Sequence, residues 1–364
     1  MKALLTIIRY VVGILFIFSG LVKANDPMGL SYKMQEFFEV WGIHFLNEYS
    51  LALSVLMIAF EIIAGVAVII GWRFRLFSWL LLLLIIFFTF LTAYAVFSGK
   101  IRECGCFGDC FKLQAMESFM KDLILTVLIV FLFTQRNKIA SQVSQRAGWM
   151  IMILTTVFSF GLQAWVLKHL PLVDCLPYKV GANILEKRKI PAGAIPDSTV
   201  INFVYAKAGK EVEFDADHFP EDFSDTAYTF VKRYDKLIRK GNAEPPIKDF
   251  VLINEQETDS TEAILNKPGP LLILFVKNWQ PVWKGEVERL KVEAGKNSIP
   301  FIIASSSANE VRADVSVPVM KSDFVAIKTA ARVDPTLYFL RDGTIVGKWA
   351  LGNLDKALSS INKP

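Results

Sequence analysis

The chain has 364 residues, of which 53% are hydrophobic, and a mean hydropathy of +0.40, which is high for a soluble protein. Residues 1–170 hold 14 basic and 9 acidic side chains, whereas residues 171–364 hold 26 of each, so the whole net charge of +5 lies in the apolar half. The neutral second half has no basic stripe interleaved with aromatic residues, so a nucleic-acid partner is not expected.

Five apolar segments approach the length of about 20 residues that a membrane helix needs. They are Ala3–Val22, Leu51–Gly71, Leu76–Ser98, Phe119–Thr134 and Trp149–Leu170. Arg9 interrupts the first segment and no small-residue cleavage site follows it, so this segment predicts a membrane helix and not a cleaved signal peptide. The sequence therefore predicts a multi-pass helix bundle whose first partner is the lipid bilayer.

Basic residues near the segment ends predict the orientation, because cytoplasmic loops carry an excess of lysine and arginine. The basic residues that fall on one side if the helices alternate are Lys2, Arg9, Arg73, Arg75, Arg136, Lys138 and Arg146. That side is expected to be the cytoplasm of a bacterial cell, with everything after residue 171 in the periplasm. The predicted localisation is the bacterial inner membrane.

Between the first two segments, residues Met28–Trp41 form an amphipathic pattern. Its apolar residues recur at helical spacing and are Met34, Phe37, Phe38 and Trp41. This pattern predicts a helix along the outer membrane interface. Packing of the apolar stripe on the bundle is favoured over a role in a ligand groove.

All four cysteines, Cys104, Cys106, Cys110 and Cys175, fall on the predicted outer side, where an oxidising compartment permits disulfides. Three of them form the compact sequence Glu103-Cys-Gly-Cys-Phe-Gly-Asp-Cys. Three cysteines without a nearby histidine fit a four-ligand zinc site poorly, so no metal is expected. A structural disulfide and a redox-active dithiol both remain open, and the sequence does not choose among the three possible pairings.

The Cys-Gly-Cys-Phe-Gly sequence resembles the motif of the MauE family, the membrane proteins of methylamine utilisation, within the wider DoxX-like group. Phe18-Ser-Gly-Leu-Val-Lys23 is similar to the Ser-Gly-x-x-Lys that ends the first DoxX helix, and Glu61 followed by Gly65 and Gly71 is similar to the second helix. The resemblance covers about residues 1–135. It implies a four-helix membrane domain, to which this chain adds a fifth helix and a soluble region.

The layout also resembles bacterial vitamin K epoxide reductase homologues, in which outer-side thiols on a helix bundle pass electrons to quinone. This analogy makes a quinone the one cofactor that we consider. Cys104 and Cys106 would be the exchanging pair, with Cys110 or Cys175 as the resolving thiol. Residues 99–118, which hold Cys104, Cys106 and Cys110, are called the cysteine loop. A bridge from Cys175 to this loop would instead tether the soluble region to the bundle.

Two charged residues lie within predicted membrane helices, where charge is costly and marks function or pairing. Arg9 lies in the first helix and Glu61 near the middle of the second. An Arg9–Glu61 ion pair inside the bundle is one interpretation. A polar site for a quinone headgroup or a proton step is the other. Lys121 and Asp122 are expected at the outer interface without a special role.

Beyond the membrane segments, Thr199–Phe214 predicts two strands around a turn, and a polar stretch follows up to Pro245. The remaining sequence predicts an α/β region. Its expected strands are Phe250–Ile253, Leu271–Val276, Pro300–Ala304, Thr336–Leu340 and Thr344–Lys348, and its expected helices are Trp283–Ala294 and Leu354–Ile361.

This order, with Pro246-Ile-Lys-Asp-Phe-Val-Leu and Asp334-Pro-Thr, resembles a thioredoxin-like domain over about residues 245–364. The resemblance implies that Pro335 is cis and faces the former active site. Gln280 and Trp283 stand where the family has its two cysteines, and neither can form a disulfide. The domain is therefore interpreted as a binding or docking module, with a plain scaffold as the alternative.

The sequence thus predicts four parts. They are a four-helix DoxX/MauE-like transmembrane domain (1–135), a connector with a fifth transmembrane helix (136–170), a periplasmic β-rich linker region (171–244) and a soluble α/β thioredoxin-like domain without its Cys-x-x-Cys (245–364). The predicted function is thiol–disulfide or quinone-linked redox maturation of periplasmic proteins. The alternative is a non-enzymatic assembly factor that binds a periplasmic client and has only structural disulfides.

Overall fold

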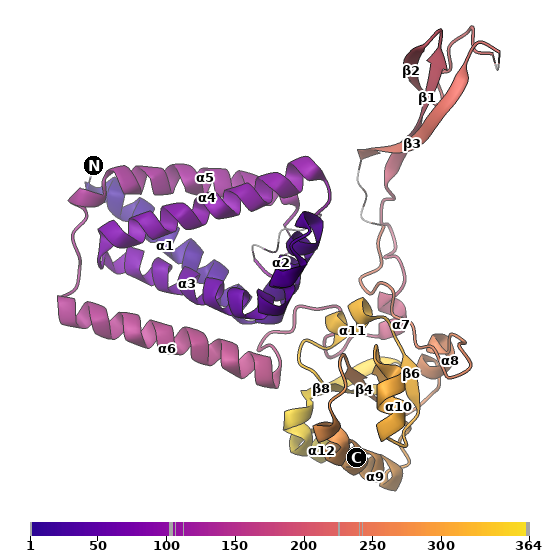
Figure 1. The fold of residues 1–364 in the computed structure, drawn as a ribbon. Coiled ribbons are helices and arrows are strands. Elements are labelled where there is room, and N and C mark those ends of the chain that lie inside the picture. The colour runs from indigo at the N-terminus through magenta and orange to yellow at the C-terminus, as the bar shows by residue number, and fades with distance from the viewer. Residues whose placement is uncertain are drawn as a thin grey trace.

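The computed structural model describes residues 2–101, 105, 107–111, 113–224, 226–239, 241 and 243–361. Figure 1 shows three parts: a helical bundle, an α/β domain beside one end of it, and a small sheet that projects away from both. The long helices of the bundle are α1 (Lys2–Ala24), α3 (Ser50–Ile70), α4 (Phe74–Ser98), α5 (Ala115–Thr134) and α6 (Gln145–His169).

Four spans within the described residues are long and apolar enough to cross a membrane, judged by length and composition. They are Ala3–Ala24, His44–Ile70, Phe74–Ser98 and Gln145–His169. The protein is therefore a membrane protein with several apolar helices. The sequence predicts a fifth crossing by α5, which packs along α4 but carries Glu117, Lys121 and Asp122 in its first half. That crossing stays a prediction.

Close packing of α1 against α3 depends on glycine. A Cβ atom added at Gly13 would lie 2.9 Å from the carbonyl oxygen of Gly65, and one added at Gly65 would lie 2.8 Å from the carbonyl oxygen of Gly13. Both distances are shorter than any van der Waals contact, so the two backbones can approach only because both side chains are missing. The pairing also fixes which residues of the antiparallel helices lie at the same depth.

The short helix α2 (Pro27–Trp41) lies across one end of the bundle, which we call the α2 end (Figure 1). Asp26 caps it by accepting a hydrogen bond from the backbone N–H of Gly29 at 3.0 Å, and Gly42, with φ of 70°, ends it. A 3-10 turn, His44–Tyr49, then leads into α3. The predicted amphipathic helix is confirmed, with Phe37 buried against the bundle.

The α/β domain is built on a five-stranded sheet of order β6-β5-β4-β7-β8. Its strands are β4 (Pro270–Val276), β5 (Phe301–Ser305), β6 (Val319–Lys321), β7 (Thr336–Arg341) and β8 (Thr344–Ala350). Strands β4, β5 and β6 are parallel, and β7 is antiparallel to both of its neighbours. Separate buried clusters cover the two faces of the sheet.

Helices and 3-10 turns surround this sheet. They are α7 (Ile184–Lys187), α8 (Thr261–Leu265), η3 (Pro281–Trp283), α9 (Lys284–Lys296), α10 (Ala308–Asp314), α11 (Phe324–Ala330), η4 (Leu351–Asn353) and α12 (Leu354–Ile361). The predicted strand over Phe250–Ile253 is wrong, because only Ile253 forms isolated bridges. Phe250 and Leu252 are buried beneath the sheet, so this apolar run is a loop that fills the core.

The projecting sheet, which we call the arm, has strand order β2-β1-β3. Its strands are β1 (Ser198–Lys207), β2 (Lys210–Asp215) and β3 (Thr229–Arg239). The predicted pair of strands is confirmed, with Ala208 and Gly209 at the turn in the positive-φ region. The third strand was not predicted, since the sequence around it reads as a polar stretch.

Candidate functional site

A disulfide joins Cys110, in the loop between α4 and α5, to Cys175, which follows α6. This pairing is the alternative in which a bridge from Cys175 to the cysteine loop tethers the soluble region to the bundle. The two residues considered as resolving thiols are paired with each other. Cys104 and Cys106 lie outside the described residues.

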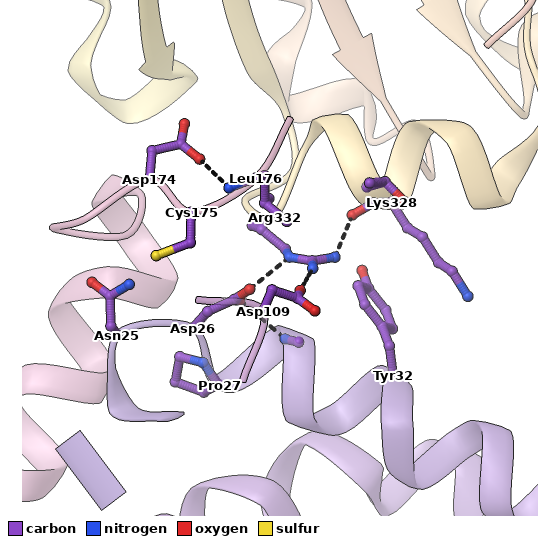
Figure 2. A network of polar contacts seen from close by, with 12 residues as sticks. Asn25, Asp26, Pro27, Tyr32, Asp109, Asp174, Cys175, Leu176, Lys328 and Arg332 are labelled. Atoms are coloured by element: carbon purple, nitrogen blue, oxygen red, sulfur yellow. Dashed lines mark hydrogen bonds and ion pairs between the residues drawn. The ribbon is translucent and has the colours of Figure 1, made fainter. Parts of the chain in front are cut away.

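Arg332, just after α11, joins the α/β domain to the α2 end of the bundle. Its Nε donates to Asp26 Oδ2 at 2.7 Å, and a second guanidinium nitrogen bonds to Asp109 of the cysteine loop. Figure 2 shows the guanidinium between these carboxylates, with Lys328 and Tyr32 beside it. Only 8% of the Arg332 side chain is exposed, so the ion pairs lie inside the interface between the two parts.

Burial and charge act against each other in this cluster. Burial raises the pKa of Asp26 above its ordinary value, although the Arg332 guanidinium and the Gly29 N–H both act to lower it. For Arg332, burial acts to lower the pKa, but Asp26 and Asp109 together outweigh it and raise the pKa. Arg332 therefore stays cationic, whereas burial makes the charged form of Asp26 less favourable than it is in water.

Further polar contacts surround the disulfide. Lys348 of β8 donates to Asp174 at 2.9 Å, and the side-chain amide of Asn25 exchanges two hydrogen bonds with the backbone of Val173, at 2.8 and 2.9 Å. Lys277, at the end of β4, donates to the hydroxyl of Tyr32 on α2 at 3.2 Å. Lys348 thus joins β8 to the segment just before Cys175, Asn25 joins that segment to the end of α1, and Lys277 joins the end of β4 to α2.

The loops expected to mark a former redox site lie close to this interface. The Asp334–Pro335 peptide bond is cis, as the resemblance implies. The Asp334 carboxylate accepts from the backbone N–H groups of Lys277 and Asn278, at 2.8 and 3.1 Å, which holds the β4 and β7 loops together.

Burial raises the pKa of the Asp334 carboxyl and lowers that of the Lys277 ammonium. Gln280, just after these loops, is exposed and Trp283 is partly buried.

Inside the bundle, the charged partner of Glu61 is Lys23. Its Nζ lies 2.6 and 2.8 Å from the two carboxylate oxygens, and Ser19 donates to Glu61 at 2.9 Å. Lys23 is 3% exposed and Glu61 is fully buried. The motif that ends the first helix therefore supplies both partners of the carboxylate.

The expected Arg9–Glu61 ion pair is wrong for a geometric reason. Ser19, which bonds Glu61, lies ten residues after Arg9, which is about 15 Å along a helix. Arg9 is buried near Gly71 instead, toward the opposite end of the bundle, and its Nε has no hydrogen-bond partner among the described residues.

A cavity of about 380 Å³ lies beside this ion pair, between α1, α2, α3, α4 and α5. Its polar lining includes Ser19, Lys23, Lys33, Lys121 and Asp122, and the rest is largely apolar. The stripe of α2 that the sequence favoured as packing lines this cavity as well, through Met34, Phe37, Phe38 and Trp41. Gly105 and Phe107 of the cysteine loop also line it.

Asp122 is fully buried within the bundle, while its place near the outer interface stays a prediction. Lys121 donates to it at 2.6 Å and Thr92 of α4 at 3.2 Å. Lys121 also lies over the ring of Phe107, with its Nζ 5.1 Å from the ring centroid. The residue pair therefore joins α4 and α5 to the cysteine loop at the wall of the cavity.

No local sequence pattern predicts the interface that Asp26, Tyr32, Asp109 and Arg332 form. The local signal at Asp26 is that of a helix cap before proline, which says nothing of an arginine 306 residues away. Lys23 belongs to the Ser-Gly-x-x-Lys motif of the first helix. Its pairing with Glu61 could not be predicted without knowing which residues of α1 and α3 lie at the same depth.

Comparison with known proteins agrees with the division into a helical region and an arm. Residues 199–240, which cover nearly all of the arm, match a domain of unknown function (DUF8463). No curated protein and no solved structure matches the chain. Residues 1–135, which hold α1 to α5, match the model of methylamine utilisation protein MauE, so the helical region of this membrane protein is similar to the MauE family.

Proposed function

We propose that this protein exchanges disulfides with extracytoplasmic proteins at the outer face of the bacterial inner membrane, with Cys104 and Cys106 as the exchanging pair. The α2 end then faces the periplasm. The match of residues 1–135 to methylamine utilisation protein MauE supports a role in maturation linked to methylamine utilisation.

One observation carries the choice of cysteines. Cys110 and Cys175 are bonded to each other, and the chain has four cysteines. Cys104 and Cys106 are the remaining two, and a single residue, Gly105, separates them in the sequence. Their oxidation to a disulfide releases two electrons and two protons, which a client disulfide or a membrane quinone takes up.

The α/β domain takes a supporting role in this proposal. Three parallel strands, an antiparallel hairpin and a cis proline before it are consistent with a thioredoxin-like domain. Gln280 and Trp283 cannot exchange disulfides, so the domain serves to dock a client beside the cysteine loop. Arg332 supports this arrangement, because it holds that loop against the domain through Asp109.

The non-enzymatic assembly factor remains the second function to be tested. The observation in its favour is the network of buried ion pairs and the Cys110–Cys175 bridge, which together fasten the two parts as a static anchor would. In that case Cys104 and Cys106 have no exchange activity.

The test is a redox titration of the full-length protein in lipid nanodiscs. Thiols are blocked after equilibration at defined potentials, and each cysteine is mapped by mass spectrometry. We expect Cys104 and Cys106 to titrate together in the range of biological thiol couples, while Cys110 and Cys175 stay bridged. A Cys104→Ser variant should lose the transition and Cys175→Ser should retain it. If no cysteine titrates in that range, the assembly factor is the correct function.

A further inference from the structure

We propose that the cavity beside Lys23 and Glu61 binds a membrane quinone, with its ring at Lys33 and its isoprenoid tail directed toward the lipid. The redox role of the bound quinone in this inference rests on the proposed function. Its evidence comes from the lining, the openings and the charges of the cavity itself.

The size and location of the cavity fit a small lipid-soluble molecule. Its volume of about 380 Å³ falls within the range of about 300–1,000 Å³ that is usual for small-molecule sites. Leu15, Leu53 and Phe87 line it and are still 36%, 37% and 41% exposed. These residues belong to the apolar spans α1, α3 and α4, so the cavity opens on a lipid-facing flank through which a tail can pass.

The aromatic part of the lining fits a flat ring. Seven aromatic side chains from α1, α2, α4 and the cysteine loop line the space, namely Phe16, Phe37, Phe38, Trp41, Phe87, Phe88 and Phe107. Aromatic pairs gain energy from offset-stacked or edge-to-face contacts beyond the area they bury. A quinone ring can form such contacts, whereas an acyl chain cannot.

The charges of the lining favour a neutral ligand. Lys23 pairs with Glu61, Lys121 with Asp122 and Lys33 with Glu36, so each of these lysines already has a carboxylate within 3.0 Å. A phosphate buried among them would have to break such a pair or remain uncompensated, which is costly. The cavity therefore suits a quinone better than a phospholipid headgroup.

Lys33 is the donor best placed for a ring carbonyl. An ammonium has three N–H donors, and within the described part of the chain Lys33 gives one to Glu36 at 3.0 Å. Its aliphatic chain lies against Gly105, since a Cβ added there would be 3.0 Å from Lys33 Cγ. A carbonyl bonded to Lys33 would thus lie beside the cysteine loop. There the quinone would accept two electrons and two protons from a dithiol, giving quinol and a disulfide.

The experiment uses a photoactivatable azidoquinone with a ten-carbon tail and the full-length protein in nanodiscs. Cys104 and Cys106 are both replaced by serine, so that binding is measured without the proposed chemistry. Labelled peptides are mapped by mass spectrometry, and affinity is measured by competition with the unmodified quinone. We expect saturable labelling of peptides from α2, α4 or the cysteine loop. Lys33→Met, which keeps the side-chain length but has no donor, should weaken binding about tenfold, as expected for the loss of one hydrogen bond from a charged donor.

Leu91→Trp fills the cavity and should abolish labelling. The matched control is Leu83→Trp on the same helix, because Leu83 is 59% exposed and is not among the lining residues. Equal labelling of both variants, or displacement by anionic phospholipid but not by quinone, would overturn the proposal. If the quinone binds but the cysteines of the native protein do not titrate, the proposed function is refuted and the quinone site is still supported.

Discussion

A guanidinium that is taken out of water needs anionic partners, because an unpaired buried charge costs several kcal/mol. Arg332 has two such partners, Asp26 and Asp109, and both belong to the bundle although the arginine belongs to the α/β domain. One side chain thus connects three segments: the start of α2, the cysteine loop and the loop that precedes the cis proline.

We expect Arg332→Ala to separate the α/β domain from the bundle. Removing one partner of a buried ion pair typically costs about 3–5 kcal/mol, because the carboxylates left behind remain buried. Thermal unfolding followed by a fluorescent distance reporter between the two parts measures this loss. Arg289→Ala is the matched control, since its pair with Asp355 is exposed and should matter little. Equal effects of the two substitutions would contradict a role for Arg332 in docking.

Docking of the α/β domain on the bundle should depend on pH through the titration of Asp26. Because burial raises the pKa of Asp26, the docked state binds a proton more tightly than the undocked state. Its contribution to docking should therefore grow as pH falls toward the raised pKa and decline as pH rises through it. Asp26→Asn keeps the helix cap but does not titrate.

The measurement is the thermal midpoint of both proteins from neutral to mildly acidic pH. The difference between them should shift in favour of the native protein on acidification, and a shift in favour of the variant would show that the ion pair outweighs the burial of Asp26.

At the scale of elements, the Cys110–Cys175 bridge connects the loop before α5 to the segment after α6, across 65 residues. A cross-link over a loop of this length stabilises by about 4 kcal/mol in the chain-entropy model. Cys110→Ser, Cys175→Ser and the double variant should all lose a similar amount of stability in denaturant unfolding. Cys104→Ser should lose little, and a loss as large as that of Cys175→Ser would indicate a different pairing.

The helices and hairpins that local patterns define could be predicted from sequence. Long apolar runs gave α3 and α4 to within two residues at each end, and Arg341-Asp342-Gly343 gave the turn between β7 and β8. Strand β3 could not be predicted in this way, because its sequence shows no regular alternation of apolar and polar residues, and its apolar residues Phe230, Val231 and Ile238 are exposed. Its position comes from pairing with β1.

The site was predictable only in part, for a physical reason. Glu61 and the Lys23 motif could each be recognised, but their pairing depends on the depth at which α1 crosses α3 through Gly13 and Gly65. The Arg332 cluster joins residues 223 and 306 positions apart, and no local pattern carries that information.

For the whole molecule, the arm should be separable from the rest. Its aromatic residues pack mostly on one another, as Tyr205, Phe214 and Tyr228 do, and the clusters described on both faces of the five-stranded sheet draw their residues from outside the arm. Replacing residues 198–239 by a short Gly/Ser linker should leave the thermal midpoint of the remainder and the Cys110–Cys175 bridge unchanged. A lower midpoint or a lost bridge would show that the arm supports the fold.

In the proposed function, two of the four cysteines cycle between thiol and disulfide while the other two remain a fixed tether. The most direct measurement is peptide mapping of the full-length protein from membranes in which thiols are blocked at the moment of cell lysis. We expect Cys110 and Cys175 always to be bridged to each other, whereas Cys104 and Cys106 should occur both as free thiols and as a disulfide. A Cys104–Cys106 pair found in one state alone, and unchanged after addition of a thiol reductant or a quinone, would contradict the proposed function.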